Sequence, residues 1–166
     1  MTIHAGHPFP TPEDPVRRLR ARLGGQVSLW TASGEGEEWA GLTVTSLMVA
    51  NGEPARLLAL VDPDSDLRDA LDDSGAAVVS LLEWRHRQLS EAFAGTAPAP
   101  GGPFRTGDFE PTEWGPRLAD APTWAGVRVE STAEVGWSVL VTATIEHLEV
   151  GADEEPLIHR RGRYVQ

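Results

Sequence analysis

The chain has 166 residues, of which 40% are hydrophobic and 23% are charged, a composition typical of a globular protein with one sizeable core. It contains no Cys, and all 14 of its basic residues are Arg. This excludes thiolate nucleophiles, Schiff-base lysines, disulfides and zinc sites built from cysteine. The net charge of −11 argues against binding to nucleic acid or to an anionic membrane, because both need a surplus of cationic side chains.

Neither a secretion signal nor a membrane span is visible in the sequence. No charged, apolar and small-residue signal opens the chain, and no apolar run approaches the roughly 20 residues that cross a bilayer. We therefore expect a cytoplasmic protein. Four prolines before residue 16 exclude regular structure there, so residues 1–14 are predicted to form an extended arm and residues 15–166 a single domain.

The first predicted element is a short helix whose two ends are both marked. Asp14 is suited to the N-cap, Pro15 to the first helical position, and Gly24-Gly25 to the end. The helix carries four arginines, which we expect to form a solvated basic face: Arg17, Arg18, Arg20 and Arg22.

Most of the remaining chain shows the patterns of β-strands. Alternation and β-branched or apolar runs predict seven strands, over residues 26–33, 39–50, 56–61, 76–82, 125–132, 136–150 and 156–165. Two further helices are predicted, one after Asp62-Pro63-Asp64-Ser65 and ending at Gly75, and one over residues 85–94. Residues 96–116 are rich in Pro and Gly and predict a long loop, either a lid or a packed surface loop. Together these elements indicate a mainly β fold, an antiparallel barrel with two or three peripheral helices.

Common catalytic motifs are missing from the sequence. There is no G-x-G-x-x-G after a strand, no H-E-x-x-H and no G-x-S-x-G. The five His are scattered, and the closest pair, His4 and His7, lies in the Pro-rich segment, so no metal site is predicted.

One predicted strand, over residues 41–47, is unusually rich in hydroxyl groups. Alternation places Thr43 and Thr45 on one face, and on the other face Leu42, Val44 and Ser46. Hydroxyl groups can donate or accept hydrogen bonds, so a strand face lined with them suits the binding of a planar heterocycle that has donors and acceptors on its edge. Thr is also common in strands without any functional reason, and the run alone does not decide between these interpretations.

In the order and spacing of its segments, the chain resembles the flavin reductase-like, FMN-binding split-barrel family from about Gln26 to Val165. The matching segments are QVSLWTAS, GLTVTSLMVANGEPARLLALV, SDLRDAL, GAAVVSLL, RHRQLSEAFAG and PLIHRRGRY. The resemblance implies a homodimer of split barrels in which each subunit binds one flavin, FMN or alternatively FAD, in a cleft near the dimer interface. It also implies NAD(P)H as the hydride donor and an oxygenase as the partner that uses the reduced flavin.

The resemblance also assigns site residues. Trp30 and Thr31 would border the isoalloxazine ring, and Ser65 lies in the loop that meets the phosphate. His159 and Arg161 would lie where the nicotinamide donor approaches. The pyrimidine edge and the ribityl chain would be held by Thr43, Val44, Thr45, Ser46 and Leu47. No catalytic acid or base is predicted, because the cofactor carries out hydride transfer itself.

Three departures from the family pattern leave an alternative open. The phosphate loop is acidic, with aspartates at positions 62, 64 and 66, and Gly136-Trp137-Ser138 replaces a Gly-Asp-His stretch. Trp30 is larger than the usual residue at its position. The alternative is a non-catalytic split barrel that acts as a small-ligand or interaction module, with its phosphate site lost and its cleft filled by Trp30 or Trp137. A third alternative is another planar cofactor, a deazaflavin or haem.

Overall fold

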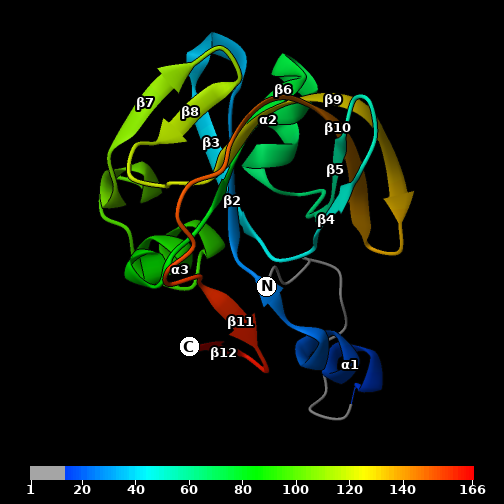
Figure 1. The fold of residues 1–166 in the computed structure, drawn as a ribbon, viewed down its shortest axis with the longest axis vertical. Coiled ribbons are helices and arrows are strands. Elements are labelled where there is room, and N and C mark those ends of the chain that lie inside the picture. The colour runs from blue at the N-terminus through cyan, green and yellow to red at the C-terminus, as the bar shows by residue number, and fades with distance from the viewer. Residues whose placement is uncertain (1–13) are drawn as a thin grey trace.

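The computed structural model describes residues 14–166 and is built around an antiparallel sheet of seven strands (Figure 1). The strand order in this sheet is β3-β2-β6-β9-β10-β5-β4, and a smaller sheet has the order β1-β11-β12. The predicted mainly β, antiparallel barrel with three helices is therefore confirmed. The predicted arm lies outside the described residues except for Asp14. None of the helices between residues 14 and 166 is long and apolar enough to cross a membrane.

The helices and strands have the following bounds. The helices are α1 (Pro15–Leu23), α2 (Asp66–Ser74) and α3 (Arg87–Ala94), with the 3-10 turns η1 (Glu35–Glu37), η2 (Trp84–His86) and η3 (Pro103–Thr106). The strands are β1 (Gly25–Gln26), β2 (Ser28–Ser33), β3 (Trp39–Val44), β4 (Leu47–Ala50), β5 (Arg56–Val61), β6 (Ala76–Leu81), β7 (Phe109–Thr112), β8 (Gly115–Leu118), β9 (Trp124–Val135), β10 (Ser138–Glu149), β11 (Ile158–Arg160) and β12 (Arg163–Val165).

The helix ends follow the predicted capping signals. The Asp14 carboxylate accepts hydrogen bonds from the backbone N–H groups of Val16 and Arg17, at 3.1 and 3.4 Å. At α2 the N-cap is Ser65, whose hydroxyl accepts a hydrogen bond from the backbone N–H of Arg68 at 3.2 Å. Its hydroxyl therefore occupies an amide that would otherwise be exposed at the helix N-terminus.

The predicted strand over residues 39–50 is wrong in one informative respect. It is two strands, β3 and β4, which form the two opposite edges of the seven-stranded sheet. The chain crosses from one edge to the other through Thr45 and Ser46, and the Ser46 carbonyl accepts a hydrogen bond from the Leu60 N–H at 3.1 Å. We call this crossing, residues 45–46, the seam. Because both edges meet at the seam, the sheet curls into a barrel.

Two other segments differ from the structure that the sequence predicts. Residues 156–165 form not one strand but the β11–β12 hairpin, because Arg161 and Gly162 adopt positive φ angles of +55° and +76° and reverse the chain. The predicted long loop, residues 96–116, contains η3, β7 and the first residues of β8, which pairs with β7 as a hairpin.

Two hydrophobic cores stabilise this arrangement of sheets and helices. The first fills the barrel and includes Trp30, Leu42 and Val44. The second lies between the barrel and α3, where Phe93 packs edge-on against Phe104 at a ring distance of 4.9 Å. Because one face of α3 is buried in this core, the neighbouring face of the helix lies beside the seam.

Candidate functional site

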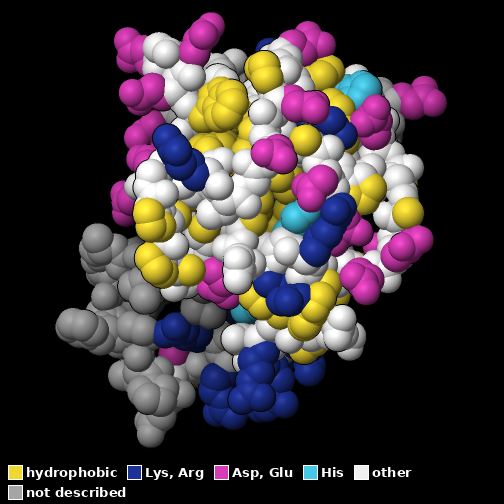
Figure 2. All heavy atoms as spheres, turned by 90° about the vertical axis from the view of Figure 1, so that its left-hand side faces the viewer, with side chains coloured by type: hydrophobic (Ala, Val, Ile, Leu, Met, Phe, Trp, Pro, Cys, Tyr) yellow, Lys and Arg dark blue, Asp and Glu magenta, His cyan; other side chains and the backbone are white. Residues whose placement is uncertain are grey.

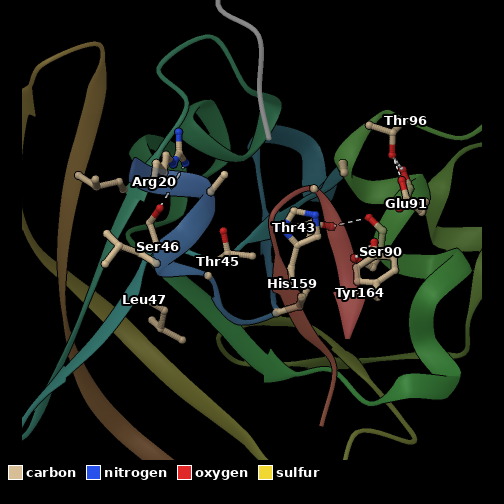
Figure 3. A pocket seen from close by; sticks show the side chains of 18 of the residues that line it. Arg20, Thr43, Thr45, Ser46, Leu47, Ser90, Glu91, Thr96, His159 and Tyr164 are labelled. Atoms are coloured by element: carbon tan, nitrogen blue, oxygen red, sulfur yellow. Dashed lines mark hydrogen bonds between the residues drawn. The ribbon is translucent and has the colours of Figure 1, made fainter. Parts of the chain in front are cut away.

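A cavity of about 560 Å³ lies beside the seam (Figure 3). Its volume falls within the range of small-molecule sites. Four parts of the chain contribute to its lining: α1, the β3–β4 region with β5 and β10, α3, and the β11–β12 hairpin. The side chains that matter for its chemistry are Arg20, Thr43, Thr45, Ser46, Leu47, Ser90, Glu91, Thr96, His159 and Tyr164.

One side of the cavity presents hydroxyl groups next to a cation. Arg20 of α1 reaches the seam and donates a hydrogen bond to the Ser46 hydroxyl at 3.3 Å. Thr45 lies beside Ser46, and Leu47 points into the same region in Figure 3. The Thr43 hydroxyl donates a hydrogen bond to the Ser90 carbonyl at 2.7 Å, so toward a ligand its oxygen can serve only as an acceptor.

The opposite side is polar and carries Glu91 of α3, the only carboxylate that the described part of the chain contributes to the lining. Glu91 accepts a hydrogen bond from the Thr96 hydroxyl. Tyr164 shares a hydrogen bond of 2.9 Å with the Ser90 hydroxyl. Burial raises the pKa of Tyr164, so its phenol is protonated at neutral pH. Figure 3 places Arg20 and Glu91 on opposite sides, with His159 between them.

His159 lies in the middle of the lining and contacts the edge of Tyr164, with the two rings 5.5 Å apart. Burial lowers the pKa of His159 below its ordinary value, while the negative charge of Glu91 acts in the opposite direction. A neutral imidazole at the centre of the cavity can donate from one nitrogen and accept at the other.

This arrangement predicts a pH effect that can be measured directly. Because the pKa is lowered, the unfolded chain binds a proton at His159 more readily than the folded chain does. The contribution of His159 to the free energy of unfolding is therefore complete above about pH 6.5 and is lost as the pH falls below that value. An NMR titration should give a pKa below 6.5, and Glu91→Gln should lower it further by removing the opposing charge. A His159 pKa at or above 6.5 in the wild type would contradict this explanation.

Five of the residues predicted from the sequence line the cavity together: Thr43, Thr45, Ser46, Leu47 and His159. Ser46 was predicted to lie on the face opposite Thr43 and Thr45. It joins them because the β3 ladder ends at Val44, so strict alternation does not continue through the seam.

The other five predicted residues lie outside the lining. Trp30, Thr31 and Val44 are buried inside the fold, and the Thr31 hydroxyl donates a hydrogen bond to the Pro116 carbonyl at 2.5 Å. Ser65 is occupied as the N-cap of α2. Arg161 lies in the turn of the hairpin, in a separate hollow with Arg160 and Arg163.

Several lining residues are not predictable from the sequence, because their signals are weak or ambiguous. Ser90, Glu91 and Tyr164 are polar residues beside apolar core positions, a pattern that also fits any solvated helix or strand. Arg20 was predicted to be part of a solvated face, and only the contact with Ser46 shows that it reaches the cavity.

The two tryptophans and the acidic loop that suggested a filled cleft or a lost phosphate site lie outside the cavity. Trp30 is part of the barrel core, and Trp137 is 65% exposed and outside the cavity lining. The acidic loop at residues 62–66 is also outside the lining, where the Asp62 carboxylate accepts a hydrogen bond from the Asp64 N–H at 2.9 Å.

Comparison with known proteins identifies the family. The family model of the flavin reductase like domain matches residues 20–166, and the chain belongs to this family. The chain is 28% identical over 152 residues to the reductase component of 4-hydroxyphenylacetate 3-monooxygenase from Thermus thermophilus, covering 92% of this chain and 95% of that protein. It is also 28% identical over 151 residues to the NADH-dependent FMN reductase AsuE2 of Streptomyces nodosus subsp. asukaensis, covering 89% and 81% of the two chains.

Solved structures agree with the fold. The flavin reductase PheA2 superimposes with a TM-score of 0.83 at 20% identity, covering 94% of this chain and 98% of that one. The NADH:FAD oxidoreductase SgcE6 of Streptomyces globisporus superimposes with a TM-score of 0.81 at 21% identity, covering 96% and 97%.

Proposed function

We propose that this protein is a flavin reductase that binds FMN or FAD in the cavity and reduces it with NADH or NADPH. The reduced flavin would then serve a partner oxygenase. The observation that carries the proposal is the cavity of about 560 Å³ in a chain of this family, with seam hydroxyls on one wall. The relative from Thermus thermophilus is the reductase component of a monooxygenase, which supports an oxygenase partner.

The residues of the cavity fit a flavin. Thr45 and Ser46 offer donors and acceptors suited to the polar edge of a flavin ring, and Arg20 lies beside them. Ala59, Leu60 and Leu140 supply an apolar wall against which a flat ring can lie.

The protein's task in this proposal is to position two rings. When bound, the isoalloxazine ring supplies the chemistry by accepting a hydride from the reduced nicotinamide, so no protein acid or base is needed. Thr43 is held in place by its bond to Ser90, and His159 is held against Tyr164. Side chains fixed in this way can keep a reacting pair in register and at close distance.

The proposal includes a homodimer in the cytoplasm. Supporting the dimer, large apolar side chains on the cavity rim are exposed, with Leu23 75%, Met48 63% and Leu60 36% accessible. A second subunit would remove this apolar surface from water and cover the open side of the cavity.

The test of this function is a titration followed by an assay. Purified protein should quench flavin fluorescence at micromolar concentrations, and catalytic amounts should make the oxidation of NADH or NADPH depend on added FMN, FAD or riboflavin. Mass measurement in solution should show two chains per particle. Absence of flavin-dependent oxidation with both nicotinamide donors and all three flavins would reject the proposal.

A further inference from the structure

A concentrated basic surface adjoins the cavity of this acidic protein. Four arginines lie on α1 and three on the β11–β12 hairpin, half of the 14 in the chain. Figure 2 shows dark blue side chains gathered at the lower end of the molecule, while acidic side chains are spread over the upper part. We call this the arginine surface, defined by Arg17, Arg18, Arg20, Arg22, Arg160, Arg161 and Arg163.

The two elements of the arginine surface are held together by contacts with backbone carbonyls. The backbone N–H of Arg161 donates to the Ala21 carbonyl at 2.8 Å, and the Arg160 guanidinium donates to the Arg22 carbonyl at 3.1 Å. These bonds keep the cationic groups of the helix and of the hairpin close together. Among the ion pairs within residues 14–166, none involves Arg18, Arg22, Arg161 or Arg163.

The arginine surface is continuous with the cavity. Arg20, His159 and Gly162 line the cavity itself, and the hairpin arginines line a second hollow of about 430 Å³ on the same hairpin. Glu91 lies on the far side of the cavity from Arg20 (Figure 3). A ligand with an anionic tail is therefore favoured in one direction, with its tail toward the arginines and away from the carboxylate.

We propose that the arginine surface binds the diphosphate of a dinucleotide whose ring end occupies the cavity. This inference rests on the proposed function and extends it to the choice of nucleotide. Guanidinium groups match phosphate oxygens with paired hydrogen bonds, and the hollow beside the cavity provides room for a small ligand. The match with the family model begins at residue 20, so the arginines at positions 17 and 18 lie before it.

Two dinucleotides share this chemistry, FAD and the nicotinamide donor, and the test distinguishes them. The test variant is Arg161→Asn with Arg163→Gln, because both side chains are exposed and Asn tolerates the positive φ at position 161. The matched control is Arg105→Gln, which removes an exposed arginine of η3 outside both hollows. Binding of riboflavin, FMN and FAD is measured at low ionic strength, together with the KM for NADH when riboflavin is the acceptor.

If the diphosphate belongs to the flavin, the double variant should weaken FAD binding about tenfold and leave riboflavin binding unchanged. If it belongs to the nicotinamide donor, the KM for NADH should rise by a similar factor while the affinities for all three flavins stay the same. In either case the difference between the double variant and the wild type should become smaller as salt is added, because salt screens the charge of the exposed guanidinium groups.

Two outcomes would overturn the inference. One is a double variant that binds FAD and uses NADH like the wild type and the Arg105 control, in which case a protein partner becomes the better candidate for this surface. The other is an equal loss for riboflavin and FAD with an unchanged KM for NADH, since riboflavin has no phosphate. Failure of the proposed function is a separate result, because it would appear as a wild-type protein that reduces none of the three flavins with either nicotinamide donor.

Discussion

Replacing Trp30 with Ala should lower the free energy of unfolding by about 3–5 kcal/mol, the largest stability loss that we expect from one substitution. Trp30 is completely buried in the barrel core, on a strand paired with both β3 and β6. The neighbours are held by these ladders and cannot close the space that the indole leaves. Urea denaturation measures the effect, and Trp137→Ala, at a position that is 65% exposed, should cost about 1 kcal/mol or less.

A second substitution at this position tests whether Trp30 touches the cofactor. The Trp30 Nε1–H is buried and has no hydrogen-bond partner among residues 14–166, so Trp30→Phe removes an unsatisfied group and retains most of the apolar volume. We expect this variant to bind FMN with wild-type affinity and an unchanged visible spectrum, because Trp30 is outside the cavity lining. A spectral shift of the bound flavin in the Phe variant would instead place the indole beside the isoalloxazine ring.

The second large effect concerns the seam. Thr45→Val combined with Ser46→Ala should weaken flavin binding by about 1–3 kcal/mol, because polar atoms of the ligand would lose their hydrogen-bond partners on the protein. This corresponds to an increase of about five- to 150-fold in Kd, measured by fluorescence titration. The seam side chains are only partly buried, so the melting temperature should change little.

A matched control for the seam is Thr132→Val on β9, an exposed threonine that lies outside the cavity. It makes the same Thr→Val change at an exposed position and should leave the Kd for FMN unchanged. Equal affinities for the wild type, the seam variant and this control would mean that flavin binds somewhere other than the seam.

Features that depend on neighbouring residues were predictable from the sequence. Asp14, Pro15 and Gly24 mark the ends of α1, and Gly75 ends α2 in a left-handed conformation with φ of +67°, because capping is decided by a few adjacent residues. Alternation and apolar runs located β5 and β6 for the same reason. The hydroxyl run, interpreted with the order of the segments, indicated the side of the barrel where the cavity lies.

Features that depend on distant residues required the structure. Thr45 on the seam, Ser90 on α3 and His159 on the hairpin share one cavity although more than 40 residues separate each from the next. The break after Val44 is also nonlocal, because the strand pattern continues through Ala50 and only closure of the barrel forces the chain across the seam.

The sequence by itself determined the chain's capped helices, its β-rich class, its family resemblance and the absence of cysteine and lysine chemistry. Tertiary structure alone decided which side chains line the cavity: it buried Trp30 and Thr31, used Ser65 as a helix cap, and joined the arginines of α1 to those of the hairpin. The physical reason is that helix caps and strand periodicity are set within a few residues. The direction in which a side chain points depends instead on long-range packing and on the closure of the sheet.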